Sequence, residues 1–378
     1  MRQYVSFLLL ILVACSCNNS GSSSSQQNDV PKVPTLSSDR MTPEVLWSFG
    51  RLGGAEVSPD DRTVLYTVTW YDIEENTSSR DIYTIPSAGG AAKRITDTPG
   101  NESNASWRPD GKKIGYLSAA SGSSQLWEMN PDGSEARQVS NIEGGISGFG
   151  YSPDGTRVFY IKSVKLDEDI HDLFPDLDKA NARLETDLMY RHWDAWHDYA
   201  YEHIFVADYS EGELKEGNDI MEDEPYDSPL KPFGGMEQIA WNADGTILAY
   251  TCKKKTGKAY TLSTNSDIYF YEPSTGETTN FTDGMMGYDK NPAFSPNGKY
   301  VAWESMEREG YESDKNRLFL AGLETGEKKD VSADFDQNVH GLTWSPDSKS
   351  IYFTSNIEGT DEIYRYSLDD QSFSRLTD

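Results

Sequence analysis

One short turn-and-strand pattern occurs six times in this sequence. The stretch 151-YSPDGTRVFYIK-162 has close copies at 57-VSPDDRTVLYT-67, 107-WRPDGKKIGYL-117, 241-WNADGTILAYT-251, 294-FSPNGKYVAWE-304 and 344-WSPDSKSIYFT-354. In the shared turn, Pro presets φ, the Asp side chain can bond its own backbone, and Gly accepts a positive φ. An alternating apolar strand follows. Such repetition restricts the chain to architectures that use one supersecondary unit several times.

Each copy also predicts the rest of a four-stranded antiparallel sheet. In the second copy, the strand 125-QLWEM-129 and the hairpin turn 130-NPDGS-134 follow, and a final strand closes the unit. The segment before a turn, such as 291-NPAF-294, supplies the fourth strand. Successive turns are 44 to 53 residues apart, with one interval of 90. A propeller blade takes about 40–50 residues, so the sequence predicts an all-β propeller with six blades over residues 41–378.

The long interval indicates an insertion in the third blade, from about residue 165 to 202. Its part 178–196 has a helix-forming composition, so we expect the insertion to be partly helical. The insertion is rich in Trp, Tyr, His and Asp, and such loops on one face of a scaffold often carry function. The alternative is that its aromatic side chains only cover the edge of a blade.

The N-terminus predicts export. Arg2 precedes the apolar run 4-YVSFLLLILVA-14, which is too short to span a membrane as an ordinary helix and has the form of a signal peptide. The residues 12-LVAC-15 resemble a bacterial lipoprotein box, which predicts lipidation of Cys15 and a membrane contact through the lipid alone. A polar tether, 16–40, follows. A plain secretory signal is the alternative, and both predict an exported protein, periplasmic or anchored in the outer membrane.

Charge and cysteine content exclude other classes. The formal net charge of −28 argues against nucleic acid as a partner. The acidic runs 167–178 and 211–227 are typical of solvated faces. The three cysteines, Cys15, Cys17 and Cys252, do not form a disulfide framework.

The inserted segment resembles a known family. The stretch 188-LMYRHWDAWHDYAYEHIFVAD-208 is similar to a segment of exported dipeptidyl peptidase V and acylaminoacyl-peptidase-like enzymes, and 41-MTPEVLWSFGRLGGAEVSPDDRTVLY-66 resembles their usual start. The turn repeats resemble the broader group of propellers that includes TolB and the prolyl oligopeptidase family. The resemblance covers residues 41–378.

The resemblance implies a serine exopeptidase with two domains and no cofactor. A propeller of seven or more blades would cap a C-terminal α/β-hydrolase domain and admit only short peptides. The hydrolase nucleophile lies on a G-x-S-x-G turn, and this sequence contains no such motif. We therefore expect the catalytic domain to be missing from this chain, which alone should not hydrolyse peptides. The alternative is a non-enzymatic, TolB-like binding or scaffold propeller lipoprotein.

The insertion also supplies the candidate binding residues. An enzyme that reads a free N-terminus needs a carboxylate for the ammonium group and an apolar wall beside it. The predicted substrate-binding residues are Arg191, His192, Trp193, Asp194, Asp198 and Glu202, with Trp196 as a second ring that could pack on the substrate. In the structural alternative, Arg191 and Asp194 pair locally and fix the insertion. His192, Asp194 and His197 lack the spacing of a zinc helix, so no metal site is predicted.

Overall fold

The computed structural model describes residues 39–98, 100–210 and 212–378. The predicted signal peptide (1–15), its Cys15 and nearly all of the tether lie outside the described residues.

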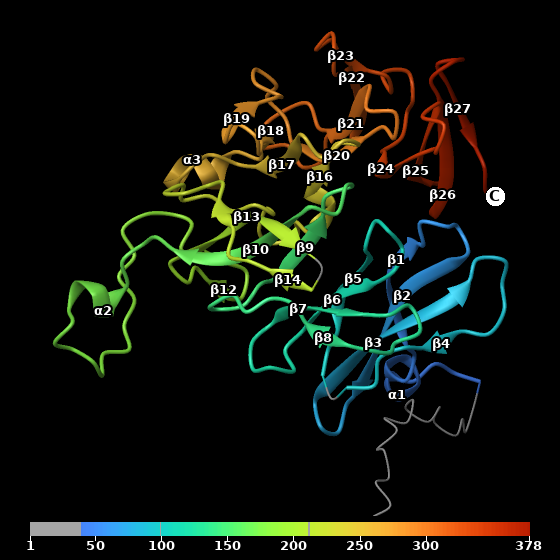
Figure 1. Cartoon of the computed structure of the whole chain (residues 1–378). Helices are drawn as coiled ribbons and strands as arrows, with labels where there is room; N and C mark the ends of the chain where they lie inside the picture. The colour runs from blue at the N-terminus through green and yellow to red at the C-terminus, as the bar shows by residue number, and fades with distance from the viewer. Residues whose placement is uncertain (1–38, 99, 211) are drawn as a thin grey trace, which may run out of the picture.

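Six antiparallel sheets follow one another along the chain (Figure 1). Blade 1 contains β1 (Arg51–Val57), β2 (Thr63–Asp72), β3 (Thr77–Pro86) and β4 (Lys93–Arg94). Blade 2 contains β5 (Ser103–Trp107), β6 (Ile114–Ser118), β7 (Gln125–Met129) and β8 (Arg137–Gln138).

Blade 3 differs from the others in its outer part. Its strands are β9 (Gly148–Tyr151), β10 (Arg157–Lys165) and β13 (Ala200–Ser210), with the short β14 (Glu213–Leu214) and β15 (Asn218–Asp219) both paired to β13.

Blades 4 to 6 are regular four-stranded sheets. Blade 4 contains β16 (Ile239–Trp241), β17 (Leu248–Cys252), β18 (Asp267–Glu272) and β19 (Glu277–Asn280). Blade 5 contains β20 (Asp289–Phe294), β21 (Tyr300–Ser305), β22 (Arg317–Gly322) and β23 (Lys328–Asp330). Blade 6 contains β24 (His340–Trp344), β25 (Ser350–Ile357), β26 (Thr360–Ser367) and β27 (Ser372–Arg375).

The first strands of the blades surround the axis of the molecule. Strands β1, β5 and β9 contact one another in succession, as do β16, β20 and β24. In Figure 1 these six strands lie around the middle, with the remaining strands of each blade outside them. The prediction of six four-stranded blades is therefore confirmed, and the fourth strand is the segment before each turn, as expected. A ring of seven or more blades stays a prediction.

The repeated turns join the first and second strands, and three of them share one side-chain hydrogen bond. The Ser hydroxyl donates to the Asp carboxylate at Ser58–Asp60 (2.7 Å), Ser152–Asp154 (2.6 Å) and Ser345–Asp347 (2.6 Å). This hydrogen bond is the main reason that the pKa of each of these Asp residues is lowered. Because every copy occupies the same place in its blade, the turns lie on one face of the ring. The connections between second and third strands, including the insertion, lie on the opposite face.

The core lies between the blades. Each of five apolar clusters joins two consecutive blades, from blades 1 and 2 through to blades 5 and 6. Large side chains of the second strands are buried in blades 2 to 6, namely Tyr116, Tyr160, Tyr250, Trp303 and Phe353. Tyr66 is half-buried, and its neighbour Leu65 takes the core position in blade 1.

Helices are short and few. They are α1 (Pro43–Trp47), α2 (Ile170–Leu173), α3 (Gly257–Leu262) and the 3-10 helix η1 (Met236–Gln238). The N-cap residue of α1, Thr42, accepts a hydrogen bond from the Val45 amide. Within the described residues, none of the helices has the length and apolar composition of a membrane-spanning segment.

The insertion is partly helical, as predicted, but its helix is α2 and not a helix within 178–196. Residues 178–196 form no helix, and their regular structure is a two-stranded hairpin of β11 (Arg191–His192) and β12 (Ala195–Trp196). Most of 178–190 is exposed, so a helix there would have no partner for an apolar face, and short isolated helices are marginal in water. Instead the Arg183 guanidinium donates to the His197 carbonyl (2.6 Å) and lies over the ring of Trp196. In Figure 1 the segment that carries α2 projects away from the ring.

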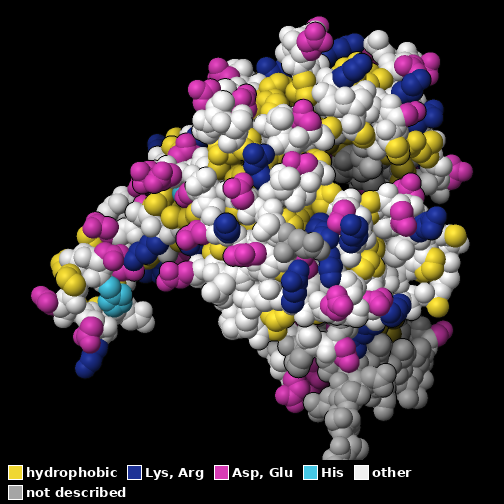
Figure 2. Space-filling model, in the orientation of Figure 1, with side chains coloured by type: hydrophobic (Ala, Val, Ile, Leu, Met, Phe, Trp, Pro, Cys, Tyr) yellow, Lys and Arg dark blue, Asp and Glu magenta, His cyan; other side chains and the backbone are white. Residues whose placement is uncertain are grey.

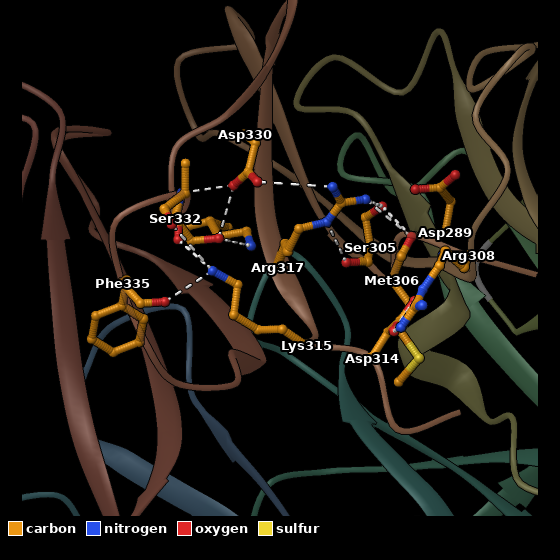
Figure 3. A network of polar contacts seen from close by, with 12 residues as sticks. Asp289, Ser305, Met306, Arg308, Asp314, Lys315, Arg317, Asp330, Ser332 and Phe335 are labelled. Atoms are coloured by element: carbon orange, nitrogen blue, oxygen red, sulfur yellow. Dashed lines mark hydrogen bonds and ion pairs between the residues drawn. The ribbon is translucent and has the colours of Figure 1, made fainter. Parts of the chain in front are cut away.

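The loops of blade 5 are fixed by the polar network in Figure 3. Arg317 donates to the Met306 carbonyl (3.1 Å) and faces Asp330 across 3.9 Å. The Lys315 ammonium donates to the carbonyls of Ser332 (2.9 Å) and Phe335 (3.0 Å). Through these contacts the loop after β21 and the loop after β23 are held to the start of β22.

Candidate functional site

The predicted site residues divide into a hairpin tip and a base. Trp193 and Asp194 form the two-residue turn of the hairpin, because His192 pairs with Ala195. Trp193 has φ of 52°, a left-handed conformation that bulky residues rarely adopt, and its side chain is 67% exposed. Strained backbone of this kind needs support from its surroundings, which is why it often occurs at binding sites.

The tip is supported by a loop of the next connection. The Trp193 ring packs edge-on against Phe233, with 4.9 Å between ring centroids, and Phe233 is 72% exposed. Tyr190 and Trp196 stack at 6.0 Å, and the Arg191 guanidinium lies over the Trp196 ring. An exposed aromatic surface therefore covers this side of the insertion.

The alternative pairing of Arg191 with Asp194 does not occur. Arg191 donates instead to the Trp193 carbonyl at 2.6 Å, which fixes the turn itself. Asp194 and Asp198 are exposed, and His192 is half-buried. The Asp194 carboxylate has no ion-pair partner among the described residues, so it stays open to a ligand.

The base is an acidic group formed by Asp198, Glu202 and Asp227. Glu202, at the start of β13, donates its backbone N–H to the Asp227 carboxylate (2.9 Å), and its own carboxylate accepts from Ser147 (2.8 Å). Lys231 forms an ion pair with Asp227 at 3.1 Å. Burial alone would lower the pKa of Lys231, but Asp227, with smaller contributions from Glu202 and Asp198, raises it. One ammonium thus already sits beside this acidic group.

The loop that joins these two parts, through Asp227 and Phe233, was not predicted from the sequence. Asp227 was assigned to a solvated acidic run, whereas its side chain is nearly buried and organises the base. Two residues beyond Lys231, Phe233 supports the hairpin tip. The lone positive charge after the acidic run, followed by Pro232, was the available signal that this segment folds back.

The histidine near the base has a structural role. The buried His203 ring contacts Asp219 through Nδ1 and the Glu224 carbonyl through Nε2, both at 2.8 Å. With both ring nitrogens engaged, His203 is not free to bind a metal. Across the described residues, no three His, Cys, Asp or Glu side chains are grouped to hold a metal ion.

The fold and sequence together define the class of this protein. A family model described as TolB beta propeller domain matches residues 33–198. The chain is a six-bladed β-propeller, and its N-terminal part is similar to the TolB beta propeller domain.

The most informative relatives are peptidases. Dipeptidyl-peptidase 5 of Porphyromonas gingivalis is 46% identical over 92% of this chain and 51% of that protein. Dipeptidyl-peptidase 5 of Porphyromonas endodontalis is 42% identical over 98% of this chain and 53% of that protein. The acylaminoacyl peptidase of Pyrococcus horikoshii has the same fold over 88% of this chain and 47% of its own, with a TM-score of 0.64 and 17% identity. The chain therefore spans about half the length of the peptidases that it matches.

Proposed function

We propose that this chain is the substrate-gating propeller of an exported serine exopeptidase of the dipeptidyl or acylaminoacyl peptidase class. The catalytic α/β-hydrolase domain would belong to the longer protein, and the substrates would be short peptides. The observation that carries this proposal is the 46% identity to a dipeptidyl-peptidase 5 over 92% of the chain. That alignment extends over the blades and the insertion together, so it does not rest on the repeated turn alone.

The insertion supports an exopeptidase role. An exopeptidase must hold the free N-terminus of its substrate at a fixed distance from the bond that it cuts. The insertion offers the carboxylate of Asp194 next to the exposed Trp193 at its tip, and the carboxylates of Asp198 and Glu202 at its base. A carboxylate next to an aromatic face is a suitable receptor for an ammonium group. Lys231 orients this acidic group through its ion pair with Asp227.

The edges of the ring support a further blade in the longer protein. Among the described residues, none of the five apolar clusters joins blade 6 to blade 1. Apolar side chains are exposed on β1, where Leu52 is 78% and Val57 is 51% exposed, and on blade 6, where Ile363 is 44% exposed. A seventh blade between them would cover these side chains.

The test compares this chain with the longer gene product. Both are assayed on dipeptidyl and acyl-aminoacyl chromogenic substrates, with and without a serine-directed inhibitor. We expect turnover by the longer protein only, because a serine hydroxyl needs a positioned base and an oxyanion hole to act as a nucleophile. Inhibitor-sensitive turnover by this chain alone would contradict the proposal. An inactive longer protein would favour the second candidate, a TolB-like binding propeller.

Export through a lipid anchor is the remaining part of the proposal. It rests on the apolar run 4–14 and on Cys15. A fatty-acid analogue supplied to a bacterial host should label the wild-type chain, and Cys15→Ala should abolish the label. Release of a soluble, unlabelled mature protein would instead assign a plain secretory signal.

A further inference from the structure

A cavity of about 400 Å³ lies between blades 1 and 2, away from the insertion. Its lining includes Arg51 and Gly53 of β1, Thr69 and Tyr71 of β2, Arg80 of β3 and Asn104 of β5. Because β1 and β5 are first strands, the cavity borders the axis of the ring. It lies at the end of β2 and the start of β3. In blade 3 the equivalent strands, β10 and β13, carry the insertion, so the cavity and the insertion are on the same face of the ring. This space is called the arginine cavity below.

The two arginines are placed by strand register. Arg51 pairs with Thr69, and Thr69 pairs with Arg80, so the three residues form one row across β1, β2 and β3. Directly paired residues in antiparallel strands project from the same side of a sheet. With neighbouring strands about 4.8 Å apart, the two arginine Cα atoms are about 10 Å apart. Two guanidinium groups therefore project into one cavity from its two sides.

Both guanidinium groups bond to neutral acceptors. Arg51 donates to the Leu46 carbonyl at 2.9 Å, and Arg80 donates through Nε to the Thr69 hydroxyl at 2.9 Å. In the part of the chain that the structure describes, neither forms an ion pair with Asp or Glu, and none of the described residues that line the cavity is acidic. The cavity thus places two cationic side chains together, without a carboxylate in its described lining, in a chain whose net charge is −28.

The space-filling view fits this contrast. Figure 2 shows Asp and Glu side chains scattered over the visible face and a group of Lys and Arg side chains near its middle. Arginine presents up to five donors in a planar fork that matches a carboxylate, and one bond each is used here. The remaining lining is small or neutral, with Gly53, Ala105 and Tyr71, so the cavity has room for more than the charged group. Its volume lies in the range of small-ligand sites.

We propose that the arginine cavity is a subsite that binds a carboxylate of a short peptide, held between Arg51 and Arg80. The carboxylate is either the C-terminus of the peptide or an Asp or Glu side chain. That the ligand is a peptide rests on the proposed function, whereas the preference for a carboxylate rests on the cavity itself.

The experiment measures peptide binding to the full chain by calorimetry at low salt. The probes are trialanine and its C-terminal amide, and the amides of N-acetylated Ala-Glu-Ala and Ala-Gln-Ala. Preference for free trialanine assigns the C-terminus as the ligand group, and preference for the Glu peptide assigns the side chain. In either case Arg80→Gln should weaken binding about tenfold or more, and raised salt should weaken it further.

Three controls keep the result interpretable. Arg62→Gln removes an exposed arginine of the same blade on the opposite face and should leave binding unchanged. Arg51→Gln tests the second cation, and Arg80→Lys keeps the charge but loses the fork, so both should weaken binding at an unchanged melting temperature. Equal binding of acids and amides, or wild-type affinity in Arg80→Gln, would overturn the proposal. Binding of inorganic phosphate alone, with no peptide bound, would also overturn it.

The two proposals fail separately. An inactive longer protein, with Arg80-dependent peptide binding intact, would reject the peptidase and keep the subsite. An active longer protein whose KM for free-acid peptides is the same in Arg80→Gln would reject the subsite and keep the peptidase.

Discussion

Tyr151 of blade 3 donates a hydrogen bond of 2.8 Å to the Glu128 carboxylate of blade 2. Glu128 is fully buried, and Tyr209 also donates to it. On its other side, 3.6 Å away, lies Arg108, which is itself held by Asp110 through two bonds of 2.9 Å. Polar side chains from two blades thus share one buried carboxylate.

We expect Glu128→Gln to lower the free energy of unfolding by about 2–4 kcal/mol, because it leaves the buried Arg108 with fewer compensating charges. Tyr151→Phe should cost about 1 kcal/mol, the usual value of one hydrogen bond. Urea unfolding at pH 7 measures both. The matched control is Glu135→Gln, whose side chain is 75% exposed and pairs with Lys113 at the surface. Equal effects of Glu128→Gln and Glu135→Gln would contradict the role of the buried carboxylate.

Asp289 makes the stability of the ring depend on pH. Burial raises the pKa of Asp289 to about 6, although Trp303 donates to it at 2.9 Å. Since the folded pKa exceeds the unfolded value of about 3.9, the wild-type protein loses stability as pH rises from about 4 to 6. Asp289→Asn should remove this loss and be more stable at pH 7 by roughly 1–3 kcal/mol.

The measurement is thermal or urea unfolding of both proteins across pH 4–8. The difference between the two curves is the relevant quantity, since the surface carboxylates titrate alike in both. The prediction would be wrong if the difference in the free energy of unfolding between the wild type and Asp289→Asn were the same at pH 4 and pH 7.

His203 contributes with the opposite sign. Burial by itself would lower the pKa of His203, but the bonds to Asp219 and to the Glu224 carbonyl outweigh burial and raise it. Its stabilisation is therefore fully present below the unfolded pKa of about 6.5 and is lost as pH rises through the folded value. His203→Gln should cost about 1–3 kcal/mol at pH 6 and less at pH 9. The exposed His171, changed to Gln, should have no effect at either pH, and a pH-independent cost for His203→Gln would refute the charged form.

The acidic group on the insertion is tested in the longer protein. Asp194→Asn and the pair Asp198→Asn with Glu202→Gln should each lower kcat/KM for peptides with a free N-terminus, by about tenfold for each charge-assisted hydrogen bond removed. N-acylated substrates should be much less affected, because they carry no ammonium group. A purely structural role would lower the melting temperature and leave kinetics unchanged. Unaltered kinetics in all these variants would remove the insertion from the substrate site.

The blade pattern could be predicted because its signals are local. A turn such as 152-SPDG-155 is closed by bonds within a few residues, so the same letters give the same structure in every copy. The structure also explains why a glycine, Gly115, occupies a position within β6 of blade 2, which the sequence does not. A Cβ there would clash with the Tyr151 hydroxyl oxygen, so the glycine makes room for the hydrogen bond to Glu128.

The site could be predicted only in part, because its parts are distant in sequence. Composition favoured a helix over 178–196, but exposure removed the packing that such a helix needs. The role of Asp227 depends on a return of the chain to Glu202, 25 residues away. The arginine cavity depends on the register of three strands, and no motif near Arg51 or Arg80 indicates it.

The insertion is joined to blade 3 at one place, where the paired strands β10 and β13 end. Strands β10 and β13 pair without interruption up to Lys165 and Ala200, and the Leu166 amide then bonds to the Tyr199 carbonyl at 3.1 Å. Residues 166–199 therefore leave and re-enter the blade at a single point, as the loop of a long hairpin. Because the pairing of β10 and β13 closes behind this segment, its length and sequence could change without disturbing the blade, and the ligand preference proposed for it could then change separately from the stability of the ring.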